Sequence, residues 1–432
     1  TKQSLSQLDV NSIERVEIVE GPMSVVYGTD ALAGVINIIT KKGDGYSEEN
    51  TWRVGARVQE ESMGKEYDFF KDKGLHNESI DLGFNHKSGL FVNGGYTRNN
   101  HGGWQGDLTG REKRWHPKDQ ALMNGMFGFQ NRNMNVWYRL DFLDEKIFGP
   151  NNGSELQPEK VSDKDFLTKR YTHQLQSDWK LDNRLDVHAA LSYQDYKRRT
   201  RTTESDLSTG EKWLSSAEAS QDITQYKAWI ARATVAWNIV PEFSIQPGVE
   251  YQWTQGEGGR IDGTPKVEDL AFFLSAEYKP WEWLSLRPGV RTFIVADYDA
   301  PIAIPSVLTK FKLTKHMDLR LSYAYGFRSP TLQELYFSFH NDNHDIDGNP
   351  DLKAEYSHNI TGSVAYRVLH SEKIHLTTTL SGFYNDFRDK ISLAQNVDIP
   401  NYNTYYNIDR YKTVGGSLEN SLSWGGLRAN LN

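Results

Sequence analysis

The 432-residue sequence contains no cysteine, no apolar run of eighteen residues and a low proportion of hydrophobic residues. Without such a run it has no helical membrane span. A hydrophobic content of 38% is compatible with a soluble protein of two or three domains. It is equally compatible with a transmembrane β-barrel, because only the lipid-facing half of each strand must be apolar. The formal charge of −8 argues against nucleic acid as a partner.

Motifs of catalysis are also missing. The chain has no cysteine nucleophile, no G-x-S-x-G, no H-E-x-x-H and no glycine loop suited to phosphate. We therefore predict that the protein is not an enzyme and holds no permanently bound cofactor.

Alternation of apolar and polar residues recurs along most of the chain. One face of the segment 185–193 carries Leu185, Val187, Ala189, Leu191 and Tyr193. The same period continues in 229–239, 243–253, 319–327 and 360–368. Segments of about ten residues can cross a bilayer as tilted strands, whereas strands of soluble sandwiches and propellers usually run about five or six residues. Aromatic residues gather near segment ends, as in interfacial girdles: Trp137, Tyr138, Trp179, Tyr251, Trp253, Trp281, Trp283 and Trp424.

Links between these segments alternate in length. The long links are 61–77, 100–118, 145–167, 199–221, 257–265 and 328–354, with short turns between them and one exception near 298–301. Outer-membrane barrels join strands by short periplasmic turns and longer external loops, so the long links should face outward. The pattern predicts an all-β, antiparallel, up-and-down barrel with about seventeen strands in this chain.

One further segment stands out near the N-terminus. Residues 12–42 read S-I-E-R-V-E-I-V-E-G-P-M-S-V-V-Y-G-T-D-A-L-A-G-V-I-N-I-I-T-K-K. Two short strands, 13–19 and 35–40, flank a Gly-Pro break and Gly28, where glycine allows a positive φ or a close backbone approach.

This segment resembles the end of the plug domain of TonB-dependent outer-membrane receptors. The resemblance implies two domains: residues 1–45 as the C-terminal part of a plug, and residues 46–432 as a transmembrane barrel with the plug in its lumen. Such barrels have about twenty-two strands in the family, so we expect this chain to lack the last strands and the N-terminal part of the plug. We also expect it to begin inside the mature protein.

The resemblance also implies a function. It is the import of a scarce metal chelate, such as haem or a ferric siderophore, across the outer membrane of a Gram-negative bacterium. TonB would be the partner, acting through an N-terminal box that precedes this chain, and outer-membrane lipid would surround the barrel. A corrinoid (vitamin B12) importer of the same family and a passive porin remain alternatives.

Three charged plug residues, Arg15, Glu17 and Glu20, lie on the first short strand. They could contact the barrel by pairing with lumen arginines, for which the candidates are Arg232, Arg287, Arg291 and Arg320. Desolvated ion pairs of marginal strength would suit a plug that must be displaced. The alternative is a solvated strand face.

The long link after residue 327 offers the candidate ligand site. Its ends, Phe327-Arg328-Ser329-Pro330 and Asn349-Pro350-Asp351-Leu352, resemble the F-R-A-P and N-P-N-L boxes of haem receptors in this family, with Ser329 in place of alanine. The resemblance implies that a histidine between the boxes ligates haem iron, and His340 and His344 are the candidates. The ligand-binding residues would further include Arg328, Tyr336, Phe337 and Phe339, whose rings could stack on a porphyrin. The alternative is that both histidines are ordinary polar loop residues.

The same link carries a second candidate site. Asn343, Asp345, Asp347 and Gly348 match the start of a calcium loop, although Ala354 replaces the expected glutamate and Glu355 comes one place late. Calcium could therefore be held in the external loop 343–348. A solvated acidic turn is the alternative.

Overall fold

The computed structural model describes residues 6–20, 25, 28, 34–41, 49–217, 219–296, 298, 300–341, 344–371, 373–396, 399 and 401–432. Most of them lie in strands, and loops and short helical turns make up the remainder. No helix in these residues is long and apolar enough to cross a membrane.

The N-terminal part contains the turn η1 (Val10–Ser12) and the strands β1 (Ile13–Glu20) and β2 (Gly34–Thr40). A large sheet follows in chain order: β3 (Thr51–Glu61), β4 (Leu75–Asn85), β5 (Leu90–His101), β6 (Lys118–Gln130), β7 (Met134–Gly149), β8 (Lys160–Lys180), β9 (Leu185–Asp206), β10 (Lys212–Leu214), β11 (Ile223–Val240), β12 (Phe243–Gly258), β13 (Lys266–Trp281), β14 (Leu284–Ala296), β15 (Ile304–Lys312), β16 (Met317–Arg328), α3 (Leu332–Tyr336), β17 (Ser338–Asn341), β18 (His344–Asp347), β19 (Glu355–His370), β20 (Ile374–Gln395), β21 (Tyr402–Trp424) and β22 (Leu427–Leu431).

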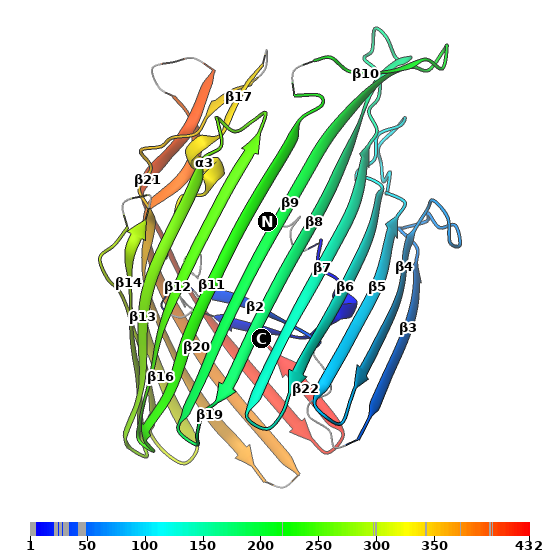
Figure 1. Ribbon diagram of the computed structural model, residues 1–432. Coiled ribbons are helices and arrows are strands. Elements are labelled where there is room, and N and C mark those ends of the chain that lie inside the picture. The colour runs from blue at the N-terminus through cyan, green and yellow to red at the C-terminus, as the bar shows by residue number, and fades with distance from the viewer. Residues whose placement is uncertain are drawn as a thin grey trace.

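The sheet is a closed barrel in which wall strands that follow one another along the chain run antiparallel (Figure 1). Three of its strands, β10, β17 and β18, are short additions within links, which leaves seventeen wall strands in the described chain. The predicted all-β barrel is confirmed. Apolar side chains such as Trp52, Leu82 and Leu380 are exposed on the wall, as lipid contact requires.

Several wall strands are longer than the sequence predicted. We placed external links at 145–167 and 199–221, whereas β8 begins at Lys160 and β9 continues to Asp206. The β8–β9 ladder is unbroken from Lys160 opposite Asp206 to Lys180 opposite Asp186. Polar cross-strand pairs continue this ladder above the apolar belt, so hydrophobic alternation alone marked the strand ends too early.

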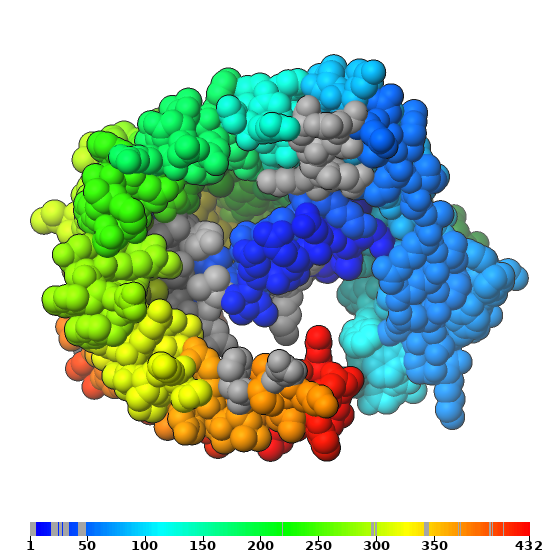
Figure 2. Space-filling view, turned by 90° about the horizontal axis from the view of Figure 1, so that it is seen from below, coloured from blue at the N-terminus to red at the C-terminus, as the bar shows by residue number. Residues whose placement is uncertain are grey.

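The β1–β2 hairpin lies inside the ring of strands, as Figure 2 shows for the blue N-terminal segment. Hydrogen bonds join it to the wall through the polar turn that precedes β1. Gln7 donates its amide to Glu145 Oε1 at 2.8 Å and accepts Arg170 Nη2 on its carbonyl oxygen at 2.8 Å. Asn11 Oδ1 accepts Arg57 Nη1 at 3.1 Å. An apolar contact adds to these hydrogen bonds, because Val25, between β1 and β2, is buried with Ile304, Phe327 and Ala354 of the barrel.

The charged residues of β1 contact each other and not the wall. Arg15 Nε lies 2.8 Å from Glu17 Oε1, and its Nη1 lies 3.1 Å from Glu14. Arg15 and Glu17 are two positions apart, so they share one face of the strand and satisfy one another. The side chain of Glu20 lies outside the described residues.

Two lumen arginines that we proposed as partners pair with the wall instead. Arg232 Nη1 and Arg291 Nη2 lie 3.0 Å and 2.5 Å from the two carboxylate oxygens of Glu250. Gly28 packs against this group with φ +87°, and a Cβ there would lie 2.9 Å from Glu250 Oε1. Both the positive φ and the close approach require glycine at this position.

The contact of Gln7 with Glu145 gives a first prediction. Glu145 is 2% exposed and accepts amide protons from Gln7 and Gln120, so Glu145→Ala leaves two buried donors without a charged acceptor. We expect the opening free energy of residues 6–12 to fall by about 2 kcal/mol. Hydrogen exchange with mass spectrometry measures it. Glu14→Ala, which removes an exposed carboxylate from the same segment, is the control, and equal exchange in both variants would contradict the assignment.

Candidate functional site

The link between β16 and β19 folds back over the ends of the wall strands (Figure 1). It contains the single turn α3 and the β17–β18 hairpin. Thr331 caps α3: its Oγ1 accepts the Glu334 amide at 3.2 Å, and Glu334 Oε2 accepts the Thr331 amide at 2.7 Å. This reciprocal capping box explains why a helical turn forms at this point of a β protein.

Arg328 joins this link to the wall. Its Nε and Nη2 donate to Glu355 at 2.9 Å and 2.7 Å, and its Nη1 and Nη2 donate to Glu334 at 2.9 Å and 3.1 Å. Glu355 Oε1 also accepts the amide of Ile391 from β20 at 2.6 Å. We call this group the Arg328 clamp (Arg328, Glu334, Glu355). Because both carboxylates bind the guanidinium fork, the clamp occupies the donors that a ligand would need.

The second sequence box, Asn349-Pro350-Asp351-Leu352, contacts the same part of the link and the wall beside it. The Asn349 amide donates to the Glu334 carbonyl oxygen at 2.9 Å, and its side chain donates to the Tyr405 carbonyl oxygen at 2.9 Å. Leu352 is buried with Leu335 and Ile391. Both boxes therefore anchor the external link to the wall.

The predicted aromatic residues take different positions. Tyr336 packs against the buried cluster around Leu335, and Phe337 forms an isolated bridge with Ile261. Phe339 lies under the guanidinium of Arg260, whose Cζ is 4.3 Å from the ring centroid. The structure thus separates Tyr336 from Phe339, which faces another external link.

Phe339 and His340 line a pocket of about 440 Å³ between three external links. The other lining residues come from the 215–222 and 259 regions and from the start of β17, and the sequence offered no signal for them. They are Ser215, Ser216, Ala217, Ala219, Gln221, Asp222, Gly259 and Ser338. Asp222 orders one side, since its Oδ1 accepts the Gly259 amide at 2.9 Å. The pocket combines an aromatic face with carboxylate, amide and hydroxyl groups, and its volume falls in the range of small-molecule sites.

His340 has carboxylates on both ring nitrogens. Its Nδ1 lies 2.5 Å from Asp345 and its Nε2 lies 3.1 Å from Asp347. The hydrogen bond to Asp345 raises the pKa of His340 above its ordinary value, and the charge of Asp347 adds to the effect. An imidazolium has no lone pair for iron, so ligation requires the loss of one ring proton and the release of one of the two contacts, whereas the other nitrogen can keep its carboxylate. The side chain of His344 lies outside the described residues, and haem ligation by either histidine stays a prediction.

The ion pairs of His340 involve two residues of the predicted calcium loop. Asp345 and Asp347 both pair with His340, and Asn343 lies outside the described residues. Within the described part of the chain, no group of three or more His, Asp or Glu side chains is arranged to hold a metal ion. Calcium in 343–348 also stays a prediction.

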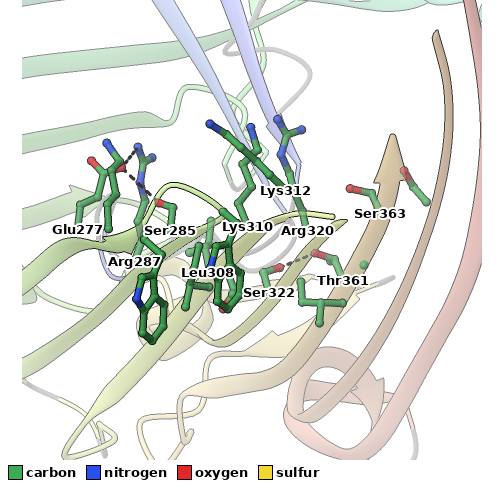
Figure 3. Close-up of a pocket in the computed structure, with 18 of the residues that line it drawn as sticks. Glu277, Ser285, Arg287, Leu308, Lys310, Lys312, Arg320, Ser322, Thr361 and Ser363 are labelled. Carbon is green, nitrogen blue, oxygen red and sulfur yellow. Dashed lines mark hydrogen bonds and ion pairs between the residues drawn. The ribbon is translucent and has the colours of Figure 1, made fainter. Parts of the chain in front are cut away.

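A second, larger cavity of about 1760 Å³ lies at the short-turn end of the barrel. Figure 3 shows the basic side chains of Arg287, Lys310, Lys312 and Arg320 extending from the same side of the sheet. Glu277 neutralises Arg287 at 3.0 Å. The lining is mixed, because these charged side chains lie beside apolar ones such as Trp281, Trp283 and Leu308.

Two family models match the chain. The model of the TonB dependent receptor-like β-barrel matches residues 246–432, and that of the TonB-dependent receptor plug domain matches residues 1–35. The domain boundary that we predicted at residues 45–46 is not tested by these ranges.

Individual relatives are more distant. The iron-regulated outer membrane virulence protein of Vibrio cholerae serotype O1 is 26% identical over 401 residues, which cover 89% of this chain and 54% of that protein. The haemoglobin and haemoglobin-haptoglobin-binding protein C of Haemophilus influenzae is 32% identical over 123 residues, covering 26% of this chain and 11% of that protein. The chain thus spans about half the length of the first of these relatives.

Solved structures share the fold. The siderophore receptor PirA from Pseudomonas aeruginosa superposes with a TM-score of 0.70 at 16% identity, covering 95% of this chain and 69% of that one. The plug and barrel models match opposite ends of the chain, and the hairpin that carries the plug match lies inside the barrel. The chain belongs to the TonB-dependent outer-membrane receptor family.

Proposed function

We propose that this protein imports a scarce metal chelate, haem or a ferric siderophore, across the Gram-negative outer membrane with energy supplied by TonB. The observation that carries the proposal is the hairpin inside the barrel, tied to the wall through Gln7 and Asn11. A passive porin keeps an open aqueous channel, whereas here a segment of the chain occupies part of the lumen.

The hydrogen bonds that Gln7 and Asn11 make with the wall suit a plug that moves. They are hydrogen bonds between polar groups, and water can replace each partner as the hairpin shifts. The net cost of exchanging one such bond for water is about 1 kcal/mol. The apolar part of the contact is small, since Val25 is the plug residue in the cluster with Ile304, Phe327 and Ala354. TonB would supply the pulling force, and the barrel itself supplies none.

Capture of the chelate is assigned to the external pocket between 215–222, 259 and 338–340. Phe339 offers a ring for stacking, and Arg260 places a cation over the other face of that ring. Anchoring of the link by the Arg328 clamp lowers the entropy lost when a ligand binds. Aromatic and cationic groups together fit an aromatic, anionic chelate.

A binding panel tests this proposal. The purified full-length receptor is titrated with haem, a set of ferric siderophores and cobalamin while tryptophan fluorescence is recorded. We expect saturable quenching by one iron chelate. Quenching by cobalamin alone would assign the corrinoid alternative, and no quenching together with free solute flux through reconstituted vesicles would assign a passive porin.

The Arg328 clamp gives a second prediction. Arg328→Gln leaves Glu334 and Glu355, whose side chains are 16% and 10% exposed, without their cation. We expect the link to lose about 3 kcal/mol of local stability, seen as faster hydrogen exchange in 332–352, and the chelate affinity to fall at least about tenfold. Arg328→Lys keeps the positive charge but not the planar guanidinium. Its hydrogen exchange and its chelate affinity should therefore lie between those of the parent and those of Arg328→Gln. Unchanged exchange in Arg328→Gln would contradict the clamp.

The histidines give a third prediction. If either ligates haem, the double variant His340→Ala/His344→Ala loses the Soret shift that the parent shows on haem titration, while its circular dichroism stays that of a β-barrel. Single variants identify the ligand. A shift that persists in the double variant rules out both residues.

The pH dependence separates His340 from His344. The carboxylates raise the pKa of His340, so its imidazolium stabilises the β17–β18 hairpin fully below the ordinary value of 6.5. This contribution is lost as the pH rises through the raised pKa, where the neutral ring becomes free for iron. If His340 is the ligand, the Soret shift should strengthen across that interval above pH 6.5, and a flat profile would argue against it.

A further inference from the structure

The cavity at the short-turn end of the barrel, with a volume of about 1760 Å³, carries a group of cations that capture at the external links does not use. Three of them lie close together on β15 and β16, and we call them the lumen basic cluster: Lys310, Lys312 and Arg320. Figure 3 shows their side chains extending in the same direction from the sheet. The cluster is separate from the external pocket, with which it shares no lining residue.

The strand register places the cluster inside the barrel. Arg291 of β14 faces the lumen, because its guanidinium lies beside the plug residue Gly28. Ser285 lies an even number of positions away on the same strand, so it shares this face. In the two ladders, Ser285 stands opposite Lys310, and Lys310 stands opposite Arg320. Lys310 and Arg320 therefore point into the lumen.

The protein supplies too few carboxylates to neutralise the cluster. Lys310 Nζ lies 3.7 Å from Asp318 Oδ2, and the same oxygen binds Arg367 at 2.7 Å. Among the described residues, Lys312 and Arg320 have no carboxylate within ion-pair distance. Lys310 and Arg320 also stand directly opposite each other, an arrangement of like charges that destabilises a sheet. An anion in the lumen would relieve this repulsion.

Other lining groups indicate which kind of anion the cavity would hold. Ser322 and Thr361 place hydrogen-bonded hydroxyl groups beside the cluster, and further serines line the cavity from β19, β20 and β21. Trp281 and Trp283 stack on one another with ring centroids 5.2 Å apart, and both line the cavity. Cations, hydroxyl donors and indole rings together fit a solute that combines negative charge with aromatic rings.

The openness of the cavity sets the strength of binding. Lys312 and Arg320 are exposed. In Figure 2, which looks from the short-turn end, the lumen is open between the blue hairpin and the orange and red strands. Exposed charges interact weakly because water and salt screen them. A solute would be attracted to the cluster but not held for long, as a site on a transport path requires.

We propose that the lumen basic cluster is a second, transient binding site for the imported chelate, which it holds through carboxylate or catecholate groups after the chelate leaves the external pocket. This inference rests on the proposed function. The two sites lie towards opposite ends of the barrel, so a solute that crosses the membrane from outside meets the cluster second. A basic wall raises the local concentration of an anionic solute, whereas a neutral chelate would gain nothing from it.

The test uses the full-length receptor with a fluorophore in the cavity. Residues 1–432 contain no cysteine, so Ser381→Cys places a single reactive thiol among the lining residues of this part. Quenching is recorded in a neutral detergent during titration with haem, with the ferric complex of dihydroxybenzoate, and with a neutral ferric trihydroxamate. Lys310→Gln/Lys312→Gln/Arg320→Gln removes the cluster. The control, Lys65→Gln/Lys71→Gln/Lys73→Gln, makes the same change in charge on an exposed external link.

We expect saturable quenching by the two anionic chelates in the parent and in the control, with an affinity at least about tenfold weaker in the cluster variant. Added salt should weaken binding more in the parent than in the cluster variant, because exposed charges are screened. TonB-dependent uptake of radioactive iron by cells should also fall in the cluster variant. If the parent imports no iron chelate, the proposed function fails, whereas the titration in detergent still decides whether the cluster binds anionic chelates.

Four results would overturn the inference. An absence of quenching in the parent would show that the cluster is covered in the full-length receptor. Equal quenching in the cluster variant and the parent, or equal affinity for the neutral chelate, would remove the role of charge. Binding of inorganic phosphate as tight as that of the chelates would identify a site for small free anions only. If the triple variant does not fold, the single charge reversal Lys312→Glu at an exposed position decides the question by the same measurements.

Discussion

Pairing of the backbone within a lipid environment is the constraint on which the rest of this structure depends. No water in the hydrocarbon region can satisfy an unpaired N–H or C=O, so each wall strand must pair on both sides. This requirement produces the ring from β3 to β22 and forces side chains to alternate between lipid and lumen. The alternation then supplies a polar interior in which hydrogen bonds and the small apolar cluster around Val25 hold the hairpin.

The same constraint explains where the chemistry lies. Within the wall, charged residues face the lumen and neutralise each other, as Arg291 and Glu250 do. Beyond the hydrocarbon region the backbone is free to leave the ladder, and there the capping box and the helical turn α3 form. The Arg328 clamp fastens this irregular segment to the regular wall, which gives the external pocket a rigid side.

Some of these features could be read from the sequence. Period-two alternation predicted the wall strands, because side-chain direction along a strand is set locally. The 12–42 segment predicted two short strands and a glycine with positive φ, and Gly28 shows why no side chain fits there. The strand ends above the belt were placed too early because their polar pairs carry no hydrophobic signal.

Contacts between distant residues could not be read in the same way. The sequence nominated Arg328 and His340 as ligand residues, but it did not show that Glu334 and Glu355 bind the first and that Asp345 and Asp347 lie beside the second. The pocket unites 215–222 with 338–340, which are more than a hundred residues apart in the chain. The sequence by itself determined the strands and which face of each is apolar, because these depend on neighbouring residues. Only the tertiary structure decided which charges meet, because those partners are brought together by closure of the barrel.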